Sequence, residues 1–434
     1  MNAHQSQTSP TSKHDDNNKN TVNVWPDKVQ TISYTSTFDD TQQCMLFYEA
    51  KMTNDNNPVD NNEHWNDSNH NDDGLKKASE NHTMSQKRPL LVALHTWSST
   101  YKQTANGSQT AYARWCINVN WHFIHPNFRG PNWTYDACGS DAAIQDIHDA
   151  ISYVKSHCSV DEDRVYGVGV SGGAHMGLLL AGKMPNVWAG LSVWAPIVDL
   201  SVWWAQRVNG VRGARRYATH IEKVVGGQPN IDNDFVCSGT TIETENITRK
   251  NKKGIIENEQ EEKEKLGEYS KERVMEECRR RSPITHLKNA INIVNIDINA
   301  GVHDGRTHGG AVPFTHALHA YNALMPSSED QLGHDFINQF YETQSPSLAI
   351  RSDDGSHLKS ANKETKTKLS NPANDEMYGN KPIIFQRESN YVRVTVFRGG
   401  HEIIHNAALN WLAAQRRGRP AIWNPREICY WMDG

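Results

Sequence analysis

One serine of this chain lies in a pattern that could form a nucleophile. Residues 169–173 read Gly-Val-Ser-Gly-Gly, at the point where an apolar run stops and a run of small residues begins. Gly-x-Ser-x-Gly between a strand and a helix is the pattern of a nucleophile elbow. Gly169 and Gly173 omit the Cβ atoms that would collide across so sharp a turn. We predict that Ser171 is a nucleophile; the alternative is an ordinary glycine-rich turn.

A serine hydroxyl needs a general base, and the base needs a carboxylate to orient it. With a nucleophile elbow, the chain order is serine, acid, histidine. Asp304 follows the apolar run 291–300, and His401 follows the apolar run 391–397. In parallel α/β sheets, catalytic groups gather at the carboxyl ends of the strands. We therefore predict Asp304 as the orienting acid and His401 as the base.

Two other residues compete for these roles. Asp297 falls inside its apolar run, and His405 lies four residues after His401.

With a histidine base, activity should rise with pH through one ionisation near the reference histidine pKa of about 6.5.

Further histidines raise the question of a metal. His308, His316 and His319 follow Asp304, but neither an HExxH motif nor a bridging carboxylate accompanies them. We therefore expect no metal and no cofactor. His175, in the helix after the serine, is interpreted as structural.

The oxyanion of an acyl-transfer reaction needs two backbone donors. One should be the N–H group of Gly172, directly after the nucleophile. The other should come from the loop after Leu94, where Trp97 is the first candidate and Thr96 the second. Trp97 could instead be only a wall of the core or pocket.

Several side chains near strand ends are candidates for the substrate pocket. They are His95, Trp133, Trp194, Trp203 and Trp204. Aromatic faces also stack on sugar rings, so an acylated sugar is a conceivable substrate; plain core packing is the alternative.

The elements that must position these residues alternate between strand and helix. Apolar or alternating runs predict strands at 29–38, 43–50, 89–94, 121–124, 164–170, 190–195, 291–300 and 391–397. Helical periodicity predicts helices at 139–157, 174–183, 312–324 and 403–415. Strands that alternate with helices indicate an α/β fold with a mostly parallel sheet and flanking helices.

Composition suggests a single domain with polar additions. Only 37% of the 434 residues are hydrophobic, and the polar residues gather in four segments, 1–28, 52–88, 226–281 and 326–388. Such segments bury too little apolar surface to offset their ordering entropy. We expect a disordered tail at 1–28 and one domain over 29–434 with three disordered inserts. Parts of 200–225 and 282–290 are candidates for a lid.

Charge, targeting signals and cysteines indicate which partners and which cellular compartment to expect. The net charge of −5 argues against nucleic-acid binding. No signal peptide is visible, and no apolar stretch approaches the roughly 18 residues that a membrane span needs, so a cytoplasmic protein is expected. Seven cysteines are widely spaced, which favours reduced thiols and leaves open a bridge between Cys116 and Cys138.

Together these motifs resemble the α/β-hydrolase superfamily, and more narrowly the catalytic domain of the prolyl oligopeptidase (S9-type) serine peptidases and allied esterases. The matching segments are 95–97, 127–131, 139–140, Asp146, 163–165, 169–173, 281–283, 301–304, 312–313 and 399–402. The resemblance implies an α/β-hydrolase fold and hydrolysis through an acyl-enzyme.

Two departures bear on the substrate. Pro131, Asn132 and Trp133 stand where the family continues Gly-Tyr-Gly, and only 88 mostly polar residues precede the core, too few for the β-propeller of the oligopeptidases. We therefore favour a carboxylic ester as the substrate. The alternatives are cleavage of short peptides or aminoacyl amides, and a non-catalytic binding protein on the same fold. The expected partner is a small-molecule or short-peptide acyl substrate.

Overall fold

The computed structural model describes residues 24–51, 86–104, 108–208, 215–229, 270–305, 311–352, 366–369 and 376–425. Most of the predicted tail 1–28 and of the predicted insert 52–88 lies outside these ranges. Among the described residues, no helix is long and apolar enough to cross a membrane.

A ten-stranded sheet runs through the molecule in the order β1-β2-β4-β3-β5-β6-β7-β10-β9-β8. The strands are β1 (Gln30–Thr35), β2 (Gln42–Tyr48), β3 (Arg88–Leu94), β4 (His122–Pro126), β5 (Val160–Val170), β6 (Gly190–Trp194), β7 (Ile296–Gly301), β8 (Lys366–Leu369), β9 (Ile383–Glu388) and β10 (Val392–Phe397). The six central strands, from β4 to β10, pair in parallel, and the two strands at each edge are antiparallel. This arrangement confirms the predicted α/β fold.

The central strands are apolar on both faces because helices cover both faces. On β3, Leu90, Val92 and Leu94 belong to one buried cluster, and Leu91 and Ala93 belong to the cluster on the opposite face. This alternation places one half of the core on each side of the sheet.

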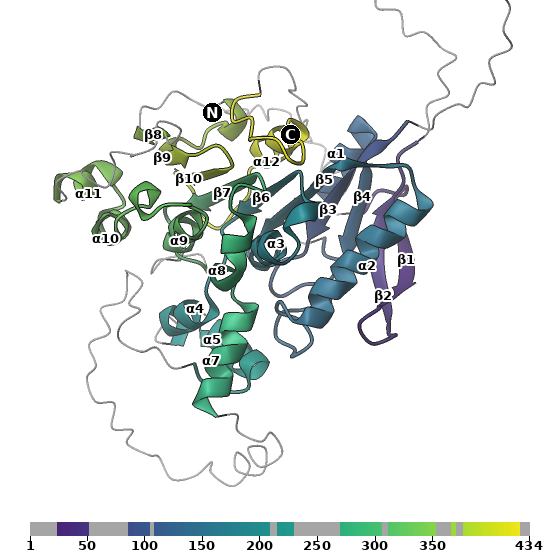
Figure 1. Cartoon of the computed structure of the whole chain (residues 1–434), viewed down its shortest axis with the longest axis horizontal. Coiled ribbons are helices and arrows are strands. Elements are labelled where there is room, and N and C mark those ends of the chain that lie inside the picture. The colour runs from purple at the N-terminus through teal and green to yellow at the C-terminus, as the bar shows by residue number, and fades with distance from the viewer. Residues whose placement is uncertain are drawn as a thin grey trace, which may run out of the picture.

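The helices that follow the strands form the two outer layers. They are α1 (Ser108–Val119), α2 (Asp141–His157), α3 (Gly172–Lys183), α8 (Pro283–His286), α9 (Thr315–Ala323), α10 (His334–Thr343), α11 (Pro346–Ser352) and α12 (His405–Ala413). In Figure 1, α2, α3, α8 and α9 lie in front of the sheet, while α1 and α12 lie behind it. The catalytic candidates Ser171, Asp304 and His401 follow β5, β7 and β10 at the carboxyl ends of these strands.

Three further helices project beyond the sheet at the lower end of the view in Figure 1. We call α4 (Leu200–Val208), α5 (Arg215–Val225) and α7 (Lys271–Arg281) the cap. They share one buried cluster with Trp97 and Val312, which includes Trp203 of α4 and Val274 of α7. Within the proposed lid segment 200–225, α4 and α5 therefore pack against the Trp97 loop. The other proposed lid segment, 282–290, packs against α3 instead, and its Leu287 and Ala290 belong to the main core.

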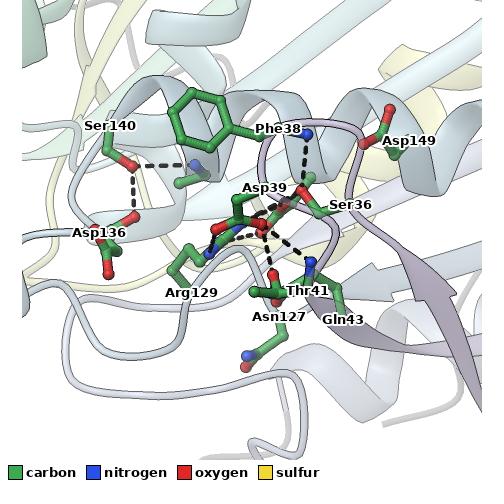
Figure 2. A network of polar contacts seen from close by, with 12 residues as sticks. Ser36, Phe38, Asp39, Thr41, Gln43, Asn127, Arg129, Asp136, Ser140 and Asp149 are labelled. Atoms are coloured by element: carbon green, nitrogen blue, oxygen red, sulfur yellow. Dashed lines mark hydrogen bonds and ion pairs between the residues drawn. The ribbon is translucent and has the colours of Figure 1, made fainter.

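The N-terminal hairpin is fastened to the core by an arginine (Figure 2). Arg129 donates to Asp39 in the turn between β1 and β2 at 2.8 Å and to Asp146 of α2 at 2.6 Å. Ser36 donates to the same Asp146 carboxylate at 2.5 Å. Hydrogen bonds from Arg129 and Thr41 lower the pKa of Asp39. Asp146 and Arg129, both part of the family resemblance, therefore have a structural role.

The predicted inserts need correction where the structure describes them. In 326–388, β9 pairs with β10, and Phe336 and Phe340 of α10 are buried in the core. In 226–281, Arg281 at the end of α7 is fully buried and donates to the carbonyl oxygen of Ala137 at 2.8 Å. These parts belong to the fold because a few apolar side chains, and polar ones with buried partners, fasten them to it. Residues 230–269, 353–365 and 370–375 lie outside the described ranges.

Candidate active site

The turn between β5 and α3 has the backbone geometry of a nucleophile elbow. Ser171 adopts φ 60° and ψ −120°, which is rare for a residue other than glycine. A Cβ atom on Gly169 would lie 2.4 Å from the carbonyl carbon of Gly173, so the turn closes only with glycine there. The strain is held by the surroundings: Ser171 donates its N–H to the carbonyl oxygen of Trp194 at 2.8 Å. Strain of this kind concentrates at functional sites.

The hydroxyl of Ser171 is not used to stabilise the helix that it begins. It makes no capping hydrogen bond to α3, and within the described part of the chain no partner for it is found. The residue is 8% exposed. The hydroxyl is therefore available to a base or a substrate.

The predicted base and acid are joined directly. Nδ1 of His401 lies 2.6 Å from Oδ2 of Asp304, and because a carboxylate only accepts, Nδ1 is the donor. Asp304 is fully buried, while the side chain of His401 is 25% exposed. Nε2 is thus left as the ring nitrogen that could accept a proton, as the predicted role of His401 requires.

Backbone groups fix the second oxygen of Asp304. Oδ1 accepts the N–H groups of Ala311 at 2.9 Å and Val312 at 3.2 Å. The loops that carry the acid and the base are also tied together, because His303 donates its N–H to the carbonyl oxygen of Gly399 at 3.0 Å. The carboxylate therefore cannot rotate away from His401 without losing two hydrogen bonds.

The two residues that compete for these roles, Asp297 and His405, contact other groups. Asp297 forms a buried ion pair with Arg393 at 2.8 Å, and the ring of His405 packs 5.4 Å from that of Tyr112. Glu402, next to His401, accepts from Lys381 at 2.9 Å and from the N–H of Gly400 at 3.0 Å. Burial would raise the pKa of Glu402, but these two donors outweigh it and lower that pKa.

Two of the predicted oxyanion donors lie against each other. A Cβ atom on Gly172 would be 2.4 Å from the backbone nitrogen of Trp97. The N–H of Trp97 donates to none of the described residues, whereas that of Thr96 donates to Oε1 of Gln103 at 3.1 Å. The arrangement favours Trp97 over Thr96.

Two predicted pocket residues are buried, with their polar ring atoms turned to other protein groups. His95 stacks on Phe128 with 3.7 Å between ring centroids, and its ring nitrogens lie near the carbonyl oxygens of Thr96 and Asn127. Trp194 is fully buried and donates to Ser192 at 2.9 Å. Both were predicted at strand ends, where an inward-facing side chain packs into the core instead of lining a site.

The other aromatic candidates gather between the cap and the Trp97 loop. Trp203 packs edge-on against Trp97, with 4.8 Å between centroids, and donates to the carbonyl oxygen of Ala311. Trp133 lies 4.8 Å from the ring of His220, and Trp204 donates to Glu222 of α5 at 2.9 Å. Trp133 and Trp204 are half-buried.

Sequence reasoning missed His220 and Asn132 in this region. Nε1 of Trp97 donates to Nδ1 of His220 at 3.2 Å, and Asn132 donates its N–H to the carbonyl oxygen of Trp97 at 2.8 Å. The signal for Asn132 was the departure from Gly-Tyr-Gly after 127–130. His220 comes from a helix that only the folded chain brings near.

Two further histidines near the site, His175 and His316, contact backbone groups. His175 lies 3.0 Å from the carbonyl oxygen of Ile197, and His316 accepts the N–H of Val198 at 3.2 Å. No group of three metal-ligating side chains occurs in the ranges that the structure describes; His308 is outside them. Cys116 and Cys138, left open as a disulfide, are both free and buried.

Comparison with known proteins identifies the family of the chain. The BD-FAE family model matches residues 79–296, half of the chain. The chain belongs to the BD-FAE family. This match includes the elbow at Ser171 and ends before Asp304 and His401. Among the curated proteins compared with the chain, none is a match.

Solved structures similar to this BD-FAE chain carry peptidase and hydrolase names. Puromycin hydrolase has a TM-score of 0.42 at 12% identity, with 75% of this chain and 39% of that chain covered. The acylaminoacyl peptidase of Pyrococcus horikoshii has a TM-score of 0.38 at 12% identity, covering 68% and 35%. A prolyl endopeptidase has a TM-score of 0.41 at 12% identity, covering 74% and 36%. The chain spans little more than a third of their length.

The resemblance stated from the motifs is thus confirmed. This BD-FAE chain is an α/β-hydrolase-type enzyme, a hydrolase.

Proposed function

We propose that the chain is a serine hydrolase that cleaves carboxylic esters through an acyl-enzyme on Ser171. The observation that carries the proposal is the 2.6 Å hydrogen bond between His401 and Asp304. This bond joins the two loops that follow β7 and β10. These loops start from the same edge of the sheet as the strained elbow after β5, because the strands between them pair in parallel. A buried carboxylate that holds a half-buried imidazole by Nδ1 is the arrangement that general-base catalysis needs.

The proposed reaction has two halves. Oγ of Ser171 attacks the carbonyl carbon while Nε2 of His401 takes the hydroxyl proton, and Asp304 stabilises the imidazolium that forms. The carbonyl oxygen becomes an oxyanion that the N–H groups of Gly172 and Trp97 stabilise. The alcohol leaves with the proton from His401. Water then attacks the acyl-enzyme while His401 takes a proton from it. His401 returns this proton to Oγ of Ser171 as the acid is released.

The aromatic side chains between the cap and the Trp97 loop support a substrate with a flat or ring-shaped group. Trp133 and Trp204 are half-buried, as is His220. Aromatic faces and polar edges of this kind suit both sugar rings and aromatic acyl groups. An acylated sugar is one member of this class.

Cleavage of short peptides or aminoacyl amides is the second candidate, since the same groups serve both reactions. Amides are harder because the leaving amine must be protonated as it departs. A non-catalytic binding protein on this fold is the third.

Two measurements test the proposal. A fluorophosphonate probe should label the wild-type chain at Ser171 and leave Ser171→Ala unlabelled; an unlabelled wild-type chain would favour the binding protein. A panel of p-nitrophenyl esters should be turned over faster than aminoacyl and proline-containing p-nitroanilides. The reverse order would make the chain a peptidase.

A further inference from the structure

Asn132 is a buried amide whose two ends have different partners. Its Oδ1 accepts the backbone N–H of Cys138 at 2.9 Å, which assigns the other end as the donor Nδ2. The residue is 1% exposed, and Nδ2 is buried with no hydrogen-bond partner among the residues that the structure describes. A buried donor without a partner is costly and therefore uncommon.

The free end of this amide lies beside the two proposed oxyanion donors. A Cβ atom on Gly172 would be 3.0 Å from Nδ2 of Asn132 and 2.4 Å from the backbone nitrogen of Trp97. The amide therefore packs against the same face of Gly172 as the Trp97 loop. No residue other than glycine fits at position 172, since a Cβ atom there would meet Trp97 and Asn132.

The backbone of Asn132 holds the same loop from the other side. Its N–H donates to the carbonyl oxygen of Trp97 at 2.8 Å. This bond fixes the peptide plane on the carboxyl side of Trp97, and the packing of Nδ2 against Gly172 fixes the distance between this loop and the elbow. One residue thus touches both partners of the proposed oxyanion hole.

We propose that Asn132 is the positioning residue of the oxyanion hole. It holds the N–H of Trp97 beside that of Gly172, and the positive end of its own unpaired amide adds to the field at the oxyanion. This inference rests on the proposed function, because it assigns Asn132 to an oxyanion that forms only if Ser171 attacks a carbonyl. Preorganised donors of this kind act on the transition state more than on the bound substrate.

Asn132→Asp is the most informative substitution. It keeps the size of the side chain and the acceptor for Cys138, and it replaces the donor end with a negatively charged oxygen. With p-nitrophenyl acetate we expect kcat to fall on the order of 10²–10³-fold, as when an oxyanion donor is lost, and KM to change less than about threefold. Binding of a boronic acid that forms a tetrahedral adduct on Ser171 should weaken in parallel with kcat.

Two controls separate this role from a purely structural one. Asn127→Asp makes the same change in the same segment, on a half-buried residue, and should keep kcat within about threefold. Asn132→Ala removes the amide without adding charge and should lower kcat by less than Asn132→Asp does. If Asn132→Asp does not fold, a kcat effect of Asn132→Ala at unchanged KM carries the same test.

The outcomes distinguish this inference from the proposed function. If Ser171→Ala is inactive while both folded Asn132 variants keep the wild-type kcat and boronic acid affinity, Asn132 has no positioning role. If KM rises and kcat holds, Asn132 contacts the substrate instead, and the inference is overturned. If the wild-type chain and Ser171→Ala hydrolyse esters equally poorly, the proposed function fails and this inference fails with it.

Discussion

His401 and Asp304 share a hydrogen bond of 2.6 Å although 97 positions separate them in the chain. Parallel pairing of β7 with β10 creates this contact, because it brings Gly301 opposite Phe397 and starts both loops from the same edge of the sheet. The order of the strands, more than any local motif, therefore assembles the acid–base pair.

Asp304→Asn tests whether this bond works through charge. An amide can present Nδ2–H to the ring and force the unsuitable tautomer on His401, so we expect kcat to fall on the order of 10³–10⁴-fold. The backbone donors of Ala311 and Val312 still have an oxygen to bind, so the melting temperature should change little. Ester hydrolysis and thermal unfolding measure the two effects. Activity near that of the wild-type chain would show that Asp304 is only a structural residue.

The nucleophile and the base should fail together. Ser171→Ala and His401→Ala should each lower kcat on the order of 10⁶-fold and fold normally, because groups of a triad act as a unit and their effects do not add. His405→Ala is the matched control, since this histidine lies in the next turn of chain and packs against Tyr112. The assignment must move to His405 if its variant is inactive and His401→Ala is active. Initial rates with p-nitrophenyl acetate decide.

Much of this site could be predicted from the sequence because its residues follow continuous apolar runs. Ser171 comes directly after β5, while Asp304 and His401 lie in the loops that follow β7 and β10. Strands that are buried on both faces, as these are, can be recognised from the sequence. Asn132 and His220 could not be assigned, since their partners Trp97 and Gly172 come from distant loops. Trp194 was misplaced because a residue at a strand end can face either the core or the site.

The fold was predicted less well in the polar segment 326–388. Its strand β9 buries Gln386, Arg387 and Glu388, which are at most 6% exposed. Arg387 donates to the carbonyl oxygen of Asp330 at 3.1 Å. Composition alone predicts a loop for such a strand, because it shows that the side chains are polar but not that they have buried hydrogen-bond partners.

Phe340→Ala tests the assignment of α10 to the core. The ring of Phe340 lies 4.9 Å from that of Phe314 and 5.7 Å from that of Phe385 in β9. Its removal should destabilise the domain by about 3–5 kcal/mol. Leu348→Ala, at a residue 49% exposed, is the control and should cost less than about 0.5 kcal/mol. The urea midpoints of the two variants compare these effects. Equal midpoints would mean that α10 is only a surface addition to the domain.

Buried neutral histidines should make the domain sensitive to acid. Burial lowers the pKa of His175 to about 4 and that of His316 to about 3. The neighbouring rings of His319 and His175 lower the pKa of His316 further. In the unfolded chain both titrate near 6.5. Below that pH the unfolded state binds more protons than the folded state, so stability is full above about pH 6.5 and is lost as the pH falls toward 4.

The expected slope is about 1.4 kcal/mol per pH unit for each such histidine. Urea midpoints measured from pH 7 to pH 4.5 should therefore fall steeply for the wild-type chain. His175→Gln cannot take up a proton, so its midpoint should be lower at pH 7 and should fall less steeply with acid. His148→Gln, on the exposed side of α2 with 51% of its side chain accessible, should keep the wild-type slope. Parallel curves for the wild-type chain and His175→Gln would mean that His175 does not titrate on unfolding as its burial requires.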